Sequence, residues 1–115
     1  MPREDSALLL DMLLSCQKIR KFTGDLSRDE FEENDLVQSA VLREFQVLGE
    51  AARMISDDGK SEYDNIPWRV ISGLRNRIIH EYFNVDLDIL WQTIQENIPE
   101  LQEALEKIIP DESED

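Results

Sequence analysis

The chain has 115 residues, 41% of them hydrophobic and 33% charged, and a formal net charge of −14. This length suffices for one domain with a single core and excludes a second one. The negative charge argues against nonspecific binding to nucleic acids, because phosphate contacts need Lys and Arg. The start of the chain lacks the regions of a signal peptide, and no apolar run approaches membrane-spanning length. We therefore expect a cytoplasmic protein with no membrane partner.

The first predicted helix runs from about Asp5 or Ser6 to Phe22. Its apolar residues form a wide stripe, so other elements should cover it; they are Leu9, Leu10, Leu13, Leu14, Cys16 and Ile19. Cys16 is the single cysteine, which excludes an intramolecular disulfide and a cysteine cluster for zinc. We expect it to be an inert core thiol.

Two helices follow. Ser27 and Glu30 have the spacing of a capping box, which predicts a short helix over about residues 28–34. The next helix, over about residues 35–56, has the clearest helical period, with apolar positions Val37, Val41, Leu48, Ala51, Ala52 and Ile55. Gly49 inside it costs about 1 kcal/mol relative to Ala, so we expect it to let another helix approach closely. Residues 57–65 are predicted to form a polar connection.

A central helix is predicted from about Pro67 to about His80, because Pro suits the first helical position. One face is apolar and comprises Trp68, Val70, Ile71, Leu74, Ile78 and Ile79; the other comprises Arg69, Ser72, Gly73, Asn76 and His80. Arg75 falls inside the apolar arc, where an unpaired charge is costly to bury. It therefore needs a carboxylate partner, with Glu44 and Glu50 as candidates, or a wet cleft.

The last predicted helix begins at Asp86 as N-cap and runs to about Ile109. Pro99 removes one N–H and should kink or briefly break this helix near Asn97. The chain thus contains four substantial helices and one short one with modest connections. This pattern predicts an all-α fold, an up-and-down bundle of four to five helices over residues 1–110, with a disordered acidic tail at 111–115.

Four residues of the central segment form a recognisable pattern. Arg75 and Asn76 are adjacent, His80 follows after three residues and Tyr82 after one more. This pattern resembles the HepT-like toxins of the HEPN superfamily (higher eukaryotes and prokaryotes nucleotide-binding). The resemblance covers nearly the whole chain, and it includes the segment 49–52, the dipeptide 67–68 and the dipeptide 90–91. HEPN domains are also similar to the predicted helical bundle.

The resemblance implies metal-independent cleavage of RNA, without a cofactor, by Arg75 and His80. His80 would act as general base or acid, and Arg75 would hold the phosphate through a two-pronged contact. Asn76 would orient the imidazole or bind the phosphate. Arg69 and Arg77 are candidates for positioning RNA or are plain surface residues. No DNA partner is expected. Acidic residues gather in segments 25–35 and 111–115, so a positive strip over 69–80 is compatible with the negative total.

The spacing of Arg75 and His80 bears on the oligomeric state. Five steps along an ideal helix place the two side chains about 140° apart, so they do not converge in one chain unless the helix deforms or ends. Two central helices that face each other across a twofold axis would bring both pairs into one cleft. HepT-like proteins form such dimers, and we expect a homodimer with a composite site.

Tyr82 has a separate role by resemblance. In HepT-like toxins of type VII toxin–antitoxin systems, the corresponding tyrosine accepts AMP from a cognate MntA-like minimal nucleotidyltransferase, which acts as antitoxin. An adenylate there would add negative charge and bulk that repel RNA. A purely structural role, as a half-buried aromatic cap on the central helix, is the other interpretation.

Two other functions are compatible with the sequence. The chain could be a non-catalytic dimeric HEPN module that binds a partner or a nucleotide, or serves as adaptor for a nucleotidyltransferase, with Arg75 and His80 as structural groups. The acidic charge slightly favours this, and the intact motif argues against it. A metal-binding bundle is less well supported, because there is one histidine and no Glu-x-x-His pair. Magnesium on carboxylates stays open.

Overall fold

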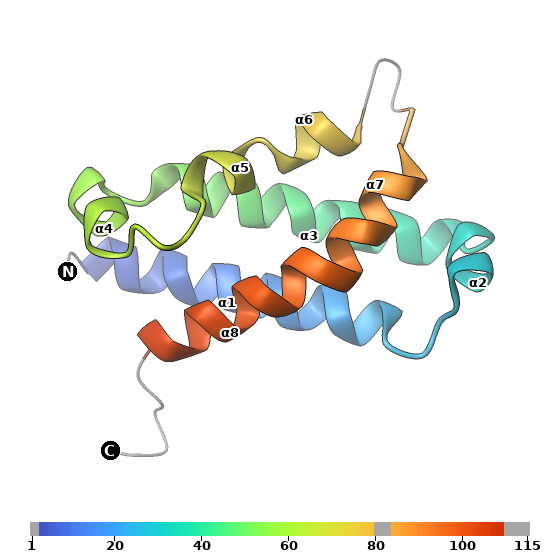
Figure 1. Cartoon of the computed structure of the whole chain (residues 1–115), viewed down its shortest axis with the longest axis horizontal. Helices are drawn as coiled ribbons and strands as arrows, with labels where there is room; N and C mark the ends of the chain where they lie inside the picture. The colour runs from blue at the N-terminus through green and yellow to red at the C-terminus, as the bar shows by residue number, and fades with distance from the viewer. Residues whose placement is uncertain (1–2, 80–83, 110–115) are drawn as a thin grey trace.

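The computed structural model describes residues 3–79 and 84–109. Helices make up nearly all of this part of the chain (Figure 1), in the order α1 (Arg3–Thr23), α2 (Arg28–Glu32), α3 (Asp35–Met54), α4 (Asp57–Glu62), α5 (Trp68–Ser72), α6 (Leu74–Ile78), α7 (Leu87–Gln92), the π-helical turn η2 (Thr93–Asn97) and α8 (Ile98–Ile108). The predicted all-α class is confirmed. None of these helices combines the length and the apolar character that crossing a membrane requires. The predicted acidic tail lies outside the described residues.

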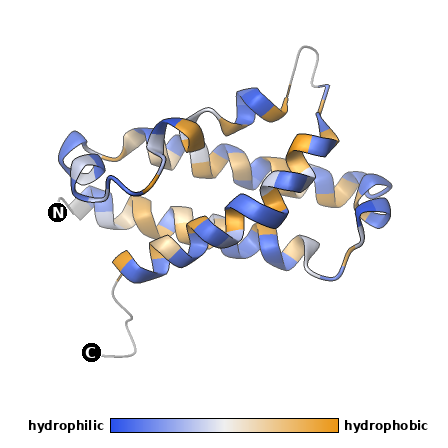
Figure 2. Ribbon diagram, in the orientation of Figure 1, coloured by the Kyte–Doolittle hydropathy of each residue, from blue (hydrophilic) through white to orange (hydrophobic). Residues whose placement is uncertain are grey.

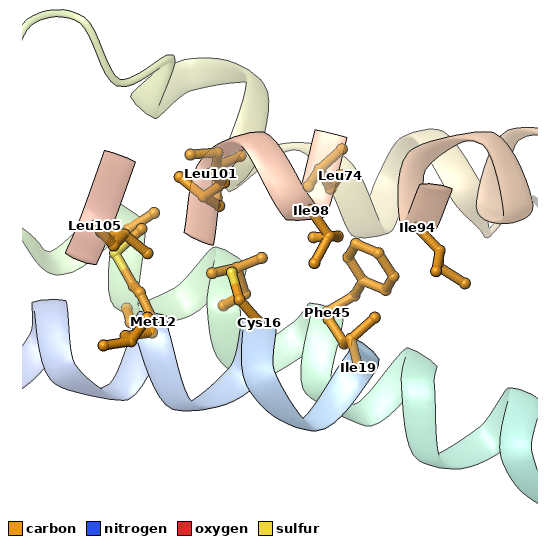
Figure 3. Packing of buried hydrophobic residues seen from close by; sticks show 14 of the residues in the cluster. Met12, Cys16, Ile19, Phe45, Leu74, Ile94, Ile98, Leu101 and Leu105 are labelled. Carbon is orange, nitrogen blue, oxygen red and sulfur yellow. The ribbon is translucent and has the colours of Figure 1, made fainter. Parts of the chain in front are cut away.

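The long helices α1 and α3 pack against each other, α8 lies along α1, and α5 and α6 lie on α3 (Figure 1). Apolar and polar residues alternate along the helices, as amphipathic packing requires (Figure 2). The core between these helices is shown in Figure 3; its labelled members are Met12, Cys16, Ile19, Phe45, Leu74, Ile94, Ile98, Leu101 and Leu105. Burial raises the pKa of the Cys16 thiol to about 12, which confirms the prediction of an inert core thiol.

The helix starts predicted from local signals are confirmed. Ser27 and Glu30 form both hydrogen bonds of the capping box, and Asp86 accepts a hydrogen bond from the backbone N–H of Ile89 at 3.0 Å. The last helical stretch has the predicted extent and also the predicted interruption, because the turn η2 directly precedes α8. Pro99 has no N–H to offer to the turn before it, and the wider π-helical turn accommodates this loss.

The predicted polar connection over residues 57–65 is wrong at its start, because α4 forms there. Ser56 is the N-cap of α4, and its Oγ accepts the N–H of Gly59 at 3.0 Å. The carboxylate of Asp5, only 2% exposed, accepts the N–H of Ser56 at 2.9 Å and its hydroxyl at 2.5 Å. Asp5 in the first turn of α1 thus binds the N-cap of α4. Because the two residues are 51 positions apart, the residues around Ser56 do not predict this contact.

The Gly59→Ala variant should be less stable than the wild type. In a helix interior Ala normally gains stability over Gly, but here the new Cβ would lie 2.5 Å from Oδ2 of Asp5 and 3.0 Å from Cγ2 of Ile55. We expect a loss of about 1–3 kcal/mol in the free energy of unfolding, measured with urea. Ser61→Ala, at an exposed position of the same helix, is the control. A Gly59→Ala protein as stable as this control would contradict the tight packing around Asp5.

Candidate functional site

The segment that contains Arg75 and Asn76 is two short helices rather than one. The predicted continuous helix over residues 67–80 is wrong in two places: it breaks at Gly73, between α5 and α6, and it ends at Ile78. The N–H of Gly73 closes α5 by bonding to the carbonyls of Arg69 and Val70 at 3.2 Å and 3.1 Å. Glycine has the lowest helix propensity after proline, so the break falls where the chain resists helix formation least.

The end of α6 changes the argument about the dimer. Ile79 is extended, with φ −104° and ψ 118°, and pairs with Val85 in an isolated antiparallel bridge. The angle of about 140° between Arg75 and His80 assumed an α-helix through residue 80 and therefore does not apply. His80 and Tyr82 lie outside the described residues, so their roles stay predictions.

Gly49 allows α5 to lie directly on α3. A Cβ at this position would be 3.3 Å from the carbonyl oxygen of Ile71 and 3.5 Å from that of Ser72. The prediction that Gly49 permits a close helix approach is thus confirmed. Trp68, at the start of α5, is buried and its Nε1 donates a hydrogen bond to the carbonyl of Tyr63 at 3.1 Å. The first contact places α5 on α3, and the second ties the start of α5 to the end of α4.

A polar cleft of about 260 Å³ lies between α3 and the pair α5–α6. We call it the polar cleft; its lining residues are Phe45, Gln46, Gly49, Glu50, Arg53, Ser72, Arg75 and Asn76. Two predicted site residues, Arg75 and Asn76, therefore share one cavity. Arg53 belongs to the same cavity and the sequence reasoning missed it. Its signal is the spacing of four residues from Gly49, which places both on one face of α3.

Arg75 occupies this cleft without a carboxylate partner. It is half-buried, and among the described residues neither Glu44 nor Glu50 lies within ion-pair distance of it. Glu50 instead accepts a long hydrogen bond from Nε2 of Gln46, at 3.5 Å. Of the two alternatives that the sequence left open, a carboxylate partner or a cleft, the described residues show Arg75 in a polar cleft. The guanidinium group is free to bind an anion.

The remaining predicted residues lie elsewhere. Arg69 and Arg77 are both exposed, and Arg77 lines a second cleft on another side of the α5–α6 pair, between this pair and α8. Val70, expected to be buried, is 54% exposed and lines that second cleft. Among the described residues, no three His, Cys, Asp or Glu side chains gather closely enough to hold a metal ion.

Comparison with known proteins gives a consistent result. The family described as "Ribonuclease HepT-like" matches residues 12–108. The chain is 39% identical over 112 residues to "Putative RNase MJ0125" of Methanocaldococcus jannaschii. The aligned region covers 96% of this chain and 97% of the relative. It is 35% identical over 108 residues to "Probable ribonuclease HepT" of Thermococcus cleftensis, covering 94% and 98%. No solved structure shows a significant match.

The Gly49→Val variant tests the contact that forms the polar cleft. The Cβ alone would lie 3.3 Å from the carbonyl oxygen of Ile71 in α5, and the two methyl groups of valine add bulk at this contact. We expect a loss of about 1–3 kcal/mol in the free energy of unfolding, measured by urea denaturation. Ser39→Val, exposed on the same helix, controls for the helix propensity of valine. Equal stability of the two variants would show that α5 does not depend on the glycine.

Proposed function

Because the chain belongs to the HepT-like ribonuclease family, we propose that it is the toxin of a type VII toxin–antitoxin system and cleaves RNA without a metal ion. The observation that carries this proposal is the position of Arg75, half-buried in a polar cleft beside Asn76 and, within residues 3–79 and 84–109, without a carboxylate partner. A cation held in this way is suited to an anionic substrate such as a phosphodiester.

The proposed reaction is an internal transesterification. The ribose 2′-oxygen forms a bond to the adjacent phosphorus while the bond from phosphorus to the 5′-oxygen breaks. His80 takes the proton of the 2′-hydroxyl or returns one to the departing 5′-oxygen, because imidazole titrates near neutral pH. The products are a 2′,3′-cyclic phosphate and a 5′-hydroxyl.

Arginines supply the electrostatic part of this mechanism. Arg75 donates two parallel hydrogen bonds to the phosphate and offsets the negative charge that develops on its oxygens. Arg53, on the opposite wall of the polar cleft, holds the same phosphate or the next one along the strand. Asn76 orients the imidazole of His80 or adds a further hydrogen bond to the phosphate. Arg69 and Arg77 guide the flanking RNA.

The proposed assembly is a homodimer with a composite site. The polar cleft is open, with α3 on one side and α5 and α6 on the other, so a second chain facing it would enclose the phosphate and exclude water. Control of the toxin is proposed to come from a cognate MntA-like nucleotidyltransferase that transfers AMP to Tyr82. The added phosphodiester is anionic and bulky, so it opposes RNA at the cleft.

The first test of this function is RNA cleavage by His80→Ala and Arg75→Lys. Loss of a general acid or base lowers a rate by about 10²–10⁴-fold, and lysine cannot replace the planar fork of arginine. We therefore expect both variants to be severely impaired while circular dichroism stays unchanged. Arg43→Lys, an exposed change on α3 outside the polar cleft, should cleave normally. Full activity of His80→Ala would remove that residue from the mechanism, and no cleavage by the wild type would favour a non-catalytic binding module.

The second test concerns Tyr82. After co-expression with the cognate nucleotidyltransferase, the wild type should gain mass in AMP units and lose RNA cleavage. Tyr82→Phe should keep its mass and its activity, because phenylalanine has no hydroxyl to accept AMP. The chain has one other tyrosine, so Tyr63→Phe is a matched control that should still be modified. Modification of Tyr82→Phe would refute the assignment of the acceptor.

A further inference from the structure

The second cleft has a lining unlike that of the polar cleft. It has a volume of about 280 Å³ and lies between the pair α5–α6 and the first half of α8. Its apolar lining consists of Ile66, Pro67, Val70, Ile71, Leu74, Ile98, Leu101 and Ala104; four polar residues, Asn65, Arg77, Asn97 and Glu100, complete it. We call it the mixed cleft. Its volume is close to the lower limit of small-molecule sites, about 300 Å³, so it suits a small ligand.

The four polar side chains are available to a ligand. All four are exposed, and none of them forms a hydrogen bond or ion pair with another residue in the part of the chain that the structure describes. The two amides offer donors and acceptors, Arg77 offers donors only, and the ionised carboxylate of Glu100 offers acceptors only. The cleft thus combines apolar walls with hydrogen-bonding groups of both kinds.

The end of the π-helical turn lies in this cleft. The turn η2 ends at Asn97, which lines the mixed cleft, and α8 begins with the next residue. Single π-helical turns are rare and often found at functional sites. Here the turn directly precedes the part of α8 that lines the cleft.

We propose that the mixed cleft holds a nucleobase of the RNA next to the scissile phosphate. A base has two apolar faces and a polar edge, and it would place its faces against Val70 and Leu101 and its edge toward Asn97 and Glu100. The pair α5–α6 separates the two clefts, with Arg75 in one and Arg77 in the other. A strand that crosses these helices can therefore bind a phosphate on one side and a base on the other. The identity of this ligand rests on the proposed function.

Glu100 gives the site a base preference. A carboxylate accepts hydrogen bonds from the exocyclic amino groups of adenine, cytosine and guanine, whereas uracil has no amino group and offers only its ring N3–H. RNA with uracil at this position should therefore be cleaved less efficiently, with a difference of roughly 3- to 10-fold, as one hydrogen bond provides. Glu100→Gln should reduce the preference, because an amide both donates and accepts.

Binding is tested separately from cleavage, by NMR titration of the protein with AMP, CMP and UMP. We expect changes at the methyl group of Ala104 and the side-chain amide of Asn97, with AMP and CMP binding more tightly than UMP. Ala104→Trp fills the cleft and Val70→Asp places a charge at its exposed edge; each should weaken binding roughly tenfold or more. Val70→Asp alters an exposed residue, so it keeps the test valid if Ala104→Trp does not fold.

The second experiment measures the cleavage of short RNAs that differ in one base by the wild type, Glu100→Gln and Glu103→Gln. Glu103→Gln is the control, because it makes the same charge change on α8 outside the cleft. A base preference that Glu100→Gln reduces and Glu103→Gln leaves intact supports the proposal.

Two results would overturn it. Cleavage that does not depend on the base, together with no NMR changes at Ala104, overturns the proposal while the ribonuclease function stands. Nucleotide binding by a protein that cuts no RNA would instead refute the proposed function. If Val70→Asp alters the oligomeric state and leaves nucleotide binding unchanged, the cleft is covered by a second chain and the proposal is wrong.

Discussion

The approach of α5 to the backbone of α3 at Gly49 is the constraint on which the site depends. The carbonyl oxygens of Ile71 and Ser72 lie where any side chain at position 49 would begin to crowd them. This contact brings two short helices onto the surface of a long one, where neither would be stable alone. The helices then form one wall of the polar cleft and one wall of the mixed cleft. This close contact therefore positions one wall of each cleft.

The frame around this contact is held at several separate places. At one end, Asp5 joins the first turn of α1 to the junction of α3 and α4 through Ser56. At the other end of the frame, two contacts join α2 to α7. Arg28 forms an ion pair with Asp88, and the hydrogen bond between them raises the pKa of Arg28. The rings of Phe31 and Trp91 also pack together, with their centroids 5.3 Å apart. These contacts involve groups far apart in sequence. They position α7 and the turn before α8, and so the second wall of the mixed cleft.

Sequence reasoning succeeded where the determining signal is local. The capping box of Ser27, the N-cap Asp86 and the break before Pro99 each depend on residues within a few positions. It failed for α4, which depends on a carboxylate 51 residues away, and for the central helix, because a helical wheel assumes continuity through Gly73. In the candidate site, the pattern of Arg75 and Asn76 could be recognised from the sequence. The spacing from Gly49 places Arg53 on the same face of α3, but only the packing of α5 and α6 on α3 brings it into the cleft of Arg75.

The negative charge of the chain is compatible with an RNA substrate, because charge acts locally. At physiological ionic strength, exposed charges beyond about 8 Å are largely screened. Helices α5 and α6 contain no acidic residue, and the polar cleft holds two arginines against one glutamate. Its local balance is therefore positive in a chain with a net charge of −14. The acidic remainder disfavours RNA at the other surfaces, so in the proposed complex RNA contacts the protein mainly through the two clefts. Such a distribution favours selective engagement over the nonspecific adhesion of a basic protein.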